Sequence, residues 1–271
     1  MNNFGPRVAS GPLRDLYNHR NLLRTLIHRD ITSRYKGSAF GALWSIASPL
    51  ILFCGYWFFL GVVLGARWGT ASSEAYPVIL FSGLIVHQCF AEVLGRATRL
   101  VISHSNYVSK VVFPIEVLPW MTVATAAFDL TINCFILLLG QLLLVGHIPV
   151  TWLWMPLVLL PLLPMAAGFS WLVSSLGVYL RDMAQVVPLV IMMLMFLSPI
   201  FYSIDMVPEQ FQTALWFSPL TIVIQLVRQV AIEGRHPDAT LFAVYAAGSC
   251  AMMAFGYWWF QRTKRGFADV L

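Results

Sequence analysis

A chain of 271 residues that is 59% hydrophobic and only 11% charged, with a formal net charge of +5, does not have the composition of a soluble protein. Soluble domains carry about 25% charged residues, and a soluble protein this apolar would expose large adhesive patches. We therefore expect an all-α membrane protein. Because the positive charges flank apolar stretches, they indicate membrane orientation rather than nucleic-acid binding.

The first forty residues are basic and contain no compact apolar stretch followed by a cleavage site, so no cleavable signal peptide is expected. Residues 1–12 are interpreted as a loose tail, and residues 13–35 as an amphipathic helix that ends near Gly37. Apolar side chains recur in this segment near helical spacing: Leu13, Leu16, Tyr17, Leu23, Ile27 and Ile31. Arginines lie between them, which is typical of a helix in the headgroup region of a bilayer.

Gaps between formal charges predict six transmembrane helices, each with the ~20 apolar residues that cross the hydrocarbon core. They are expected at residues 40–64, 76–96, 116–145, 152–178, 184–203 and 239–260. Residues 98–113 are predicted to form a short loop helix between the second and third spans.

Residues 205–238 are half apolar, carry Pro208, Pro219 and Gly234, and fit neither a span nor a soluble loop. Such segments are typical of re-entrant or interfacial helices. Irregular backbone is tolerated in a membrane only where it is buried in protein or lines a cavity. We interpret this segment as an outer gate.

Fourteen of the 17 lysines and arginines fall on the side of the six-span arrangement that holds both termini. Because cytoplasmic loops are enriched in positive charge, both termini are expected in the cytoplasm, with the chain crossing the cytoplasmic (inner) membrane. The predicted organisation is a cytoplasmic tail and amphipathic interface helix at 1–39, a six-span domain at 40–262 and a cytoplasmic tail at 263–271.

Asp129 is the most informative single residue, because a carboxylate near the middle of a span is costly unless it faces protein or water. Thr122, Thr125, Asp129 and Asn133 fall on one face of the third span at spacings of three and four. This face is either a polar contact between packed helices, which we favour, or a wet channel wall or proton site. His87, the one histidine deep in a span, is interpreted as a hydrogen-bonded interior residue.

Several kinds of site are not indicated. There is no Gly-x-x-x-x-Gly-Lys-Ser/Thr, so the chain is not expected to bind ATP through a phosphate loop. No histidine pair has metal-ligand spacing, and no metal site is predicted. Gly168-Phe169-Ser170 lacks the second glycine of a nucleophile elbow and is interpreted as a contact between helices. The four cysteines lie in apolar runs and are interpreted as small buried hydrophobic residues: Cys54, Cys89, Cys134 and Cys250.

Aromatic residues near the span ends are interpreted as interfacial belts. Tyr56 to Phe59 lie deeper than a belt requires. Flat aromatic faces suit the apolar C–H faces of sugar rings. A channel wall of aromatic side chains here would contact a passing glycan without binding it tightly. Lipid-facing packing is an equally good interpretation of each of these residues.

Four stretches of the chain together resemble one family of membrane proteins. The first runs from Arg29-Asp30 through Arg34-Tyr35-Lys36-Gly37-Ser38 to Gly41-Ala42-Leu43-Trp44 and Pro49-Leu50. The second is Val108-Ser109-Lys110-Val111-Val112-Phe113-Pro114, followed by Glu116-Val117-Leu118-Pro119. The third is Arg181-Asp182 with Pro188. The fourth joins Leu197-Ser198-Pro199-Ile200-Phe201-Tyr202 to Val207-Pro208-Glu209 and Ser218-Pro219-Leu220-Thr221.

Over about residues 20–265, the chain resembles the permease subunits of type-2 ABC exporters for polysaccharides such as O-antigen, capsule and teichoic acid. It departs from the family pattern at Ile115, where a basic residue is frequent, and at Ser48 and Ser218, where asparagine is frequent. No subfamily is therefore assigned.

The resemblance implies a channel between two copies of this chain, joined by two ATP-binding subunits that carry the ATP and Mg. The chain itself would hold no cofactor, and its partners would be membrane lipids and a lipid-linked polysaccharide. The candidate ATPase-coupling residues are Arg29, Asp30, Arg34, Arg99, Asn106, Lys110, Arg181 and Asp182. The candidate substrate-channel residues are Trp44, Tyr56, Trp57, Phe59, Asp129, Phe201 and Tyr202. The candidate outer-gate residues are Pro208, Glu209, Trp216, Pro219 and Arg228.

Two other functions are open at this point. One is an ion- or proton-coupled membrane carrier that uses Asp129 and His87 as its proton path. The other is a membrane-embedded enzyme that acts on lipid-linked sugars. A permease would depend on a partner ATPase, a carrier would need Asp129, and an enzyme would convert its substrate when purified alone.

Overall fold

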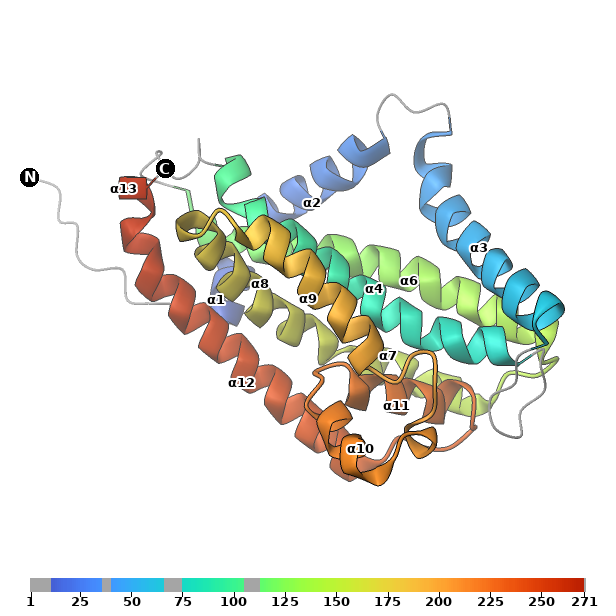
Figure 1. The fold of residues 1–271 in the computed structure, drawn as a ribbon. Helices are drawn as coiled ribbons and strands as arrows, with labels where there is room; N and C mark the ends of the chain where they lie inside the picture. Colours follow the sequence, from blue (N-terminus) through green and yellow to red (C-terminus); the bar gives the residue numbers. More distant parts are fainter. Residues whose placement is uncertain (1–10, 36–39, 66–74, 105–112, 271) are drawn as a thin grey trace, which may run out of the picture.

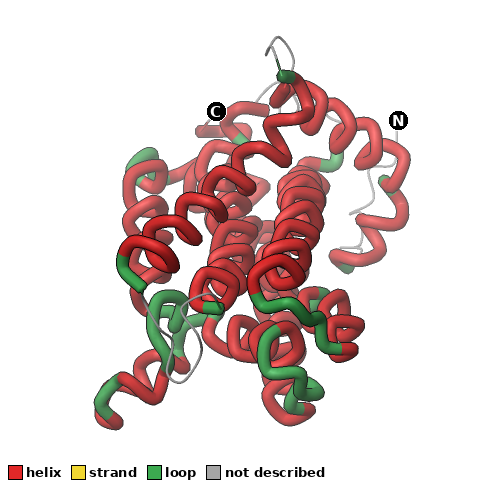
Figure 2. Tube along the Cα trace, turned by 90° about the vertical axis from the view of Figure 1, so that its right-hand side faces the viewer, coloured by secondary structure: helices red, strands yellow, loops and turns green. Residues whose placement is uncertain are grey.

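The computed structural model describes residues 11–35, 40–65, 75–104 and 113–270, and every regular element in these ranges is a helix. Figures 1 and 2 show long helices packed side by side and joined by short loops. The predicted all-α fold class is confirmed.

The elements follow one another along the chain in a simple order. The first part contains α1 (Pro12–Asn18), α2 (Arg20–Tyr35), η1 (Gly41–Leu43), α3 (Trp44–Tyr56), the π-helical η2 (Trp57–Val63), α4 (Tyr76–Leu100) and η3 (Ile102–His104). The middle part contains η4 (Ile115–Val117), α6 (Leu118–Leu144), η5 (Val150–Trp154), α7 (Met155–Leu159), α8 (Leu162–Tyr179) and α9 (Met183–Leu197). The last part contains η6 (Ile204–Met206), α10 (Glu209–Trp216), α11 (Thr221–Ala231), α12 (Ala239–Thr263), η7 (Lys264–Gly266) and α13 (Phe267–Val270).

Five helical segments in the described ranges are long and apolar enough to cross a membrane. They are Trp44–Val63, Tyr76–Leu100, Ile115–Leu144, Val150–Tyr179 and Ala239–Gly266, which correspond to the predicted first, second, third, fourth and sixth spans. A further candidate is the pair α10 and α11, whose axes bend by 96° inside the segment predicted to be re-entrant or interfacial.

The predicted fifth span, at 184–203, ends earlier than expected. α9 has 15 residues and ends at Leu197. It is therefore about 22 Å long at 1.5 Å per residue, less than the ~30 Å hydrocarbon core. The cause is Pro199, because the residue before a proline is driven out of the helical conformation. Ser198 is accordingly extended, with φ −91° and ψ 144°.

The bundle is built around α4, which packs against α6, α8, α9 and α11. In this helix 78% of the apolar window is buried, whereas in the first span, Trp44–Val63, only 6% is buried. The first span therefore offers an almost complete apolar surface to whatever surrounds the chain.

Two glycines bring α8 and α12 into close contact. A Cβ atom on Gly168 would lie 2.3 Å from the Met252 carbonyl oxygen, and one on Gly256 would lie 2.0 Å from the Gly168 carbonyl oxygen. Small residues allow this approach of two backbones in a membrane. Gly168 therefore belongs to a helix contact, as its sequence context predicts.

The predicted single amphipathic helix at 13–35 is wrong in one respect: it breaks at His19 into α1 and α2. Leu23 of the predicted apolar stripe is buried against the bundle, whereas Leu13 and Tyr17 of the same stripe are exposed. The reason lies in Asp15, which is buried and accepts a hydrogen bond from the Tyr257 hydroxyl of α12. This polar contact fixes α1 against the bundle, so the stripe does not continue across the break.

The prediction that all four cysteines are buried is also wrong. Cys89 is buried, but Cys54 and Cys250 are exposed on the outside of the bundle, and Cys134 is intermediate. An apolar side chain on a membrane span can face hydrocarbon, so its position in an apolar run does not require burial within the protein.

The α8–α12 contact provides a stability test. Gly256→Val is expected to lower the free energy of unfolding by about 1–3 kcal/mol, because the new side chain would overlap backbone atoms of Gly168. The measurement is the melting temperature of the detergent-solubilised chain. Gly248→Val on the same helix is the matched control, since a Cβ there meets nothing within 4 Å. An equal loss in both variants would contradict the contact.

Candidate functional site

Five charged side chains from three helices meet at one place, which we call the charge cluster. Its members are Asp30 and Arg34 of α2, Glu92 and Arg96 of α4, and Asp129 of α6. In α2 and in α4 the acid precedes the arginine by four residues, a spacing that puts both side chains on one helix face. α2 packs against α6 and lies outside the main bundle in Figure 1.

Arg34 contacts all three carboxylates of the charge cluster. Its Nη1 donates to Asp129 Oδ2 at 2.7 Å, its Nη2 donates to Glu92 Oε1, and its Nε lies 3.8 Å from Asp30 Oδ2. Arg96 Nη2 donates to both carboxylate oxygens of Asp30, at 2.6 and 2.7 Å. Thr125 of α6 adds a hydrogen bond to Asp30 Oδ2 at 3.1 Å. The charges on α2 are thus bonded directly to both α4 and α6.

The charge cluster is well compensated and only partly open to solvent. Its side chains are 18–28% exposed. Burial favours the neutral form of Arg34, but the carboxylates of Glu92 and Asp129 outweigh this effect and raise the pKa of Arg34 above its ordinary value. Charges at membrane depth are tolerated when they pair with one another. The favoured interpretation of Asp129, a polar contact between packed helices, therefore describes its bond to Arg34.

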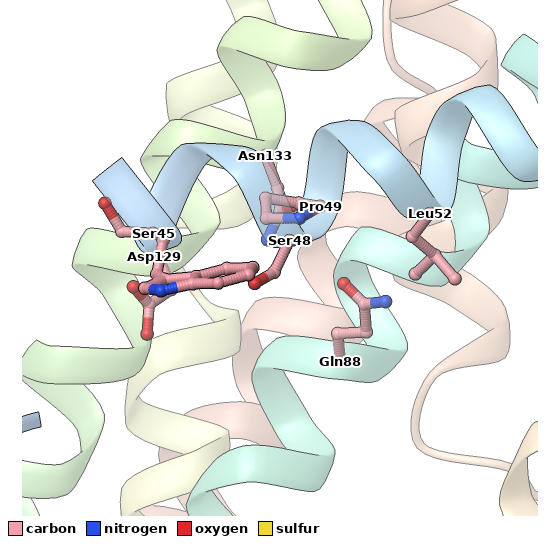
Figure 3. A pocket seen from close by; sticks show the side chains of 8 residues that line it. Ser45, Ser48, Pro49, Leu52, Gln88, Asp129 and Asn133 are labelled. Atoms are coloured by element: carbon pink, nitrogen blue, oxygen red, sulfur yellow. The ribbon is translucent and has the colours of Figure 1, made fainter. Parts of the chain in front are cut away.

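A pocket of about 300 Å³ opens beside Asp129, between α3, α4 and α6. We call it the polar pocket; it is lined by Trp44, Ser45, Ser48, Pro49, Leu52, Gln88, Asp129 and Asn133. Figure 3 shows Gln88 of α4 pointing toward α3, with Asp129 and Asn133 entering from α6. The polar pocket and the charge cluster share Asp129, so one carboxylate belongs to both sites.

The predicted ATPase-coupling residues lie in three places. Asp30 and Arg34 are in the charge cluster, and Arg29 is exposed on the same helix. Arg99 is exposed in the last turn of α4, and Arg181 and Asp182 are exposed in the turn between α8 and α9. Figure 1 places both of these at the end of the bundle that also carries α1 and α13. Asn106 and Lys110 lie outside the described residues.

The predicted substrate-channel residues are not all brought together. Trp44 and Asp129 line the polar pocket, whereas Tyr56, Trp57, Phe59, Phe201 and Tyr202 do not. Trp57 and Phe59 are exposed on η2. Tyr202 donates its hydroxyl to the Phe196 carbonyl oxygen at 2.6 Å, at the end of α9.

The predicted outer-gate residues surround the bent pair of helices. Pro208 caps α10, Glu209 is its exposed first residue, Trp216 is its last residue, and Pro219 lies in the turn before α11. Figure 1 places α10 and α11 at the opposite end of the bundle from α13.

Arg228 differs from the other gate residues because it is buried, with 4% of its surface exposed. It donates to the carbonyl oxygens of Pro199 and Ile200, at 2.6 and 3.0 Å, where α9 ends. These are backbone groups that the broken helix leaves without a helical partner. Arg228 is therefore a structural clamp between α11 and the end of α9.

The last turn of α11, which contains Arg228, makes further hydrogen bonds through its backbone. Gln141 of α6 donates to the Ala231 carbonyl oxygen at 2.6 Å, and Thr151 of η5 donates to the Val230 carbonyl oxygen at 2.7 Å. The Trp152 ring nitrogen donates to Gln141 Oε1 at 2.7 Å and completes this contact. The last turn of α11 is thus bonded to the end of α9, to α6 and to η5.

His87 and Asp129 are not joined into a proton path in the described part of the chain. The His87 ring bonds through Nε2 to the Ile191 carbonyl oxygen of α9 at 3.0 Å, and it is buried. Asp129 bonds to Arg34 of α2. The interpretation of His87 as a hydrogen-bonded interior residue is confirmed. Among the described residues, no group of three or more His, Cys, Asp or Glu is placed to hold a metal ion.

Sequence reasoning missed Gln88, Glu92 and Arg96, which supply the α4 side of both sites. A signal was present, because these three polar residues follow one another at intervals of four in a largely apolar helix. Their partners on α2 and α6 are far away in the sequence, so the pairing itself is visible only in the fold.

Comparison with known families decides the class of this membrane protein. The family model described as ABC-2 type transporter matches residues 21–232, which include α2 and the charge cluster, the polar pocket and the bent helix pair. The chain belongs to the ABC-2 type transporter family. It is therefore a multi-pass membrane permease, and the family resemblance stated from its sequence motifs is confirmed.

Three relatives match between 78% and 96% of the chain. The O-antigen export system permease protein RfbA of Klebsiella pneumoniae is 30% identical over 254 residues, 93% of this chain and 95% of the relative. The protein of the same name from Myxococcus xanthus is 25% identical over 266 residues, 96% and 98% of the two chains. The polysialic acid transport protein KpsM of Escherichia coli is 24% identical over 228 residues, 78% and 81% of the two chains.

The charge cluster predicts a specific effect of Arg34→Gln. The change leaves Glu92 and Asp129 without their cation, and breaking a buried pair costs about 3–5 kcal/mol. Because these side chains are about a quarter exposed, we expect a loss of about 1–3 kcal/mol, together with faster tryptic cleavage in α2. Melting temperature and proteolysis measure the two effects.

Arg24→Gln is the matched control, because Arg24 is exposed on the same helix and has no ion pair among the described side chains. If both variants behave like the unchanged chain, Arg34 does not hold α2 in place.

Proposed function

We propose that this chain is the membrane-spanning subunit of an ATP-driven exporter that moves a lipid-linked polysaccharide, of O-antigen or capsule type, across the cytoplasmic membrane. Its membership of the ABC-2 family supports the transporter class. The substrate class is supported by two kinds of relative, named as O-antigen permeases and as a polysialic acid transport protein.

The proposed channel lies between two copies of the chain. The first span supports this arrangement, because only 6% of its apolar window is buried, although its hydropathy is the highest of the five. Such a surface needs either lipid or a second protein surface against it. A channel for a polar polymer also needs walls from more than one side, which a second copy supplies.

ATP binding and hydrolysis belong to two partner subunits in this proposal, since the chain has no phosphate-binding loop. The partners would meet the chain at α2 and at the ends of α4 and α8, the end of the bundle with most positive charge. This end would face the cytoplasm, as would both termini. The bent pair α10 and α11 would then be the outer gate.

The charge cluster is the observation that carries the coupling proposal. Arg34 bonds α2 to α4 and to α6, and Arg96 bonds α4 back to α2. A partner that pushes α2 therefore moves the core of the bundle through short charged contacts rather than through a flexible loop. Asp129 carries the same displacement to the edge of the polar pocket.

The carrier alternative has less support. A proton path through His87 and Asp129 would need hydrogen-bonding groups between them, but His87 bonds toward α9 and Asp129 toward α2. Asp129 is also ion-paired with Arg34.

The first functional test asks whether ATP or a proton gradient drives export. In vesicles that contain this chain and its ATP-binding partner, glycan export is expected to require ATP and both polypeptides, and to continue after a proton ionophore is added. The chain alone is expected to neither export nor hydrolyse ATP. Export by the chain alone, or export abolished by the ionophore while ATP is present, would exclude the proposed mechanism.

The second functional test asks where the chain contacts its ATP-binding partner. Charge reversal by Arg99→Glu or Arg181→Glu is expected to weaken ATP-driven export about tenfold without a change in melting temperature, because both side chains are exposed at the proposed ATPase face and a misplaced charge there opposes docking. Arg235→Glu is the control, because Arg235 is 78% exposed near the opposite end of the bundle. Normal export by both Arg99→Glu and Arg181→Glu would contradict this placement of the contact.

A further inference from the structure

The polar pocket lies near the middle of α4 and α6 and in the first half of the span that begins with α3. Asp129 is close to the midpoint of Ile115–Leu144, and Gln88 is close to the midpoint of Tyr76–Leu100. Polar groups at this depth are stable where they face protein, water or a polar ligand, and costly where they face hydrocarbon. Three helices converge here to present such groups to one pocket of about 300 Å³.

Asn133 marks the polar pocket as a binding site rather than a packing defect. Its side chain is only 7% exposed, and its amide oxygen has no hydrogen-bond partner. Buried acceptors in native proteins nearly always have a donor, so an acceptor beside a pocket indicates a donor that comes from a ligand or from water. An unpaired buried acceptor lowers the stability of the protein. An asparagine with only a structural role would not be expected to carry this cost.

The lining of the polar pocket selects one chemical class. Gln88 and Asn133 each combine a donor with an acceptor, Asp129 accepts, and Ser48 can do either. Trp44 adds an aromatic group, whose face suits apolar C–H groups. A lipid acyl chain would leave these polar groups unpaired, and Asp129 disfavours an anion. A ring that carries several hydroxyls and has apolar faces matches both the polar groups and the aromatic group of this lining.

We propose that the polar pocket is a subsite for a single neutral sugar ring of the transported polysaccharide. This inference rests on the proposed function for the identity of the substrate, and it adds where one ring is recognised and by which side chains. Ligand pockets span about 300–1,000 Å³, so a pocket of about 300 Å³ is matched to one ring rather than to a length of polymer.

The position of Asp129 gives this subsite a consequence for transport. A sugar hydroxyl that donates to Asp129 adds a hydrogen bond to the carboxylate that already accepts from Arg34. The occupied pocket and the position of α2 are therefore energetically coupled, because both depend on the same carboxylate. Substrate binding in the pocket would change the free energy of moving α2, the helix proposed to face the ATPase.

The test uses the full chain with its ATP-binding partner in lipid nanodiscs. In a background with Ala at Cys54, Cys89, Cys134 and Cys250, Ser48→Cys places one thiol in the polar pocket. Its reaction rate with a small water-soluble thiol reagent is measured with glucose, galactose, mannose, rhamnose or N-acetylglucosamine. At about ten times its dissociation constant, a bound sugar is expected to slow the reaction about tenfold.

Two variants separate a subsite from a general effect. Thr213→Cys, exposed on α10, is expected to react at the same rate with and without sugar. Asn133→Leu, added to Ser48→Cys, is expected to abolish protection while the melting temperature stays the same or rises, because the unpartnered oxygen is removed. A merely structural asparagine would instead lower the melting temperature.

Each other outcome overturns the subsite. Reaction at residue 48 that no sugar slows indicates water only, protection by sodium or potassium ions but not by sugars indicates a cation site, and reaction only with a lipid-soluble reagent indicates a pocket filled by lipid. ATP-dependent glycan export is measured in parallel in the unchanged chain. Export without sugar protection discards the subsite and leaves the proposed function intact, whereas loss of ATP dependence discards the proposed function itself.

Discussion

The structure depends on one constraint: a charge within a membrane protein is stable only when it is paired with an opposite charge or with backbone carbonyl groups. Arg34 on α2 meets this constraint by bonding to Glu92 of α4 and Asp129 of α6. The attraction that keeps these charges in place is also what attaches α2 to the bundle. α2 lies outside the packed helices, and the charge cluster therefore decides how far it can move before the bundle has to follow.

The same principle, applied to backbone, explains the opposite end of the molecule. Pro199 stops α9 before it can cross a membrane alone, and the carbonyl groups exposed there need donors. Arg228 supplies them from the last turn of α11, and Gln141 and Thr151 bond the final backbone carbonyls of the same turn. A charged side chain thus replaces missing backbone hydrogen bonds. α2 is linked to the bundle by ion pairs between side chains, whereas the end of α9 is linked to α11 by side-chain bonds to backbone.

The sequence was sufficient for the features that depend on local composition. Long apolar stretches between charges predicted six spans, and five of them are helices long enough to cross a membrane. The prolines in 205–238 predicted a re-entrant or interfacial segment, where the bent pair lies. Both features depend on the composition of each segment by itself. The sequence failed where a partner distant in the sequence decides the outcome. Asp15 fixes α1 through Tyr257 and breaks the predicted amphipathic helix. For Asp129, the sequence identified the cost of the charge but not Arg34, the residue that compensates it.

Asp129 connects the two halves of the transport problem. In an ATP-driven exporter, ATP hydrolysis must affect the bound substrate, although ATP and the substrate bind at separate sites. Here a carboxylate near the middle of a span touches the helix proposed to face the ATPase and also lines a pocket with polar side chains. No long relay is needed, because α2, α4 and α6 meet at this one residue and its neighbours. A shift of α2 must either carry Asp129 with it or break its bond to Arg34, and both results change the polar edge of the pocket.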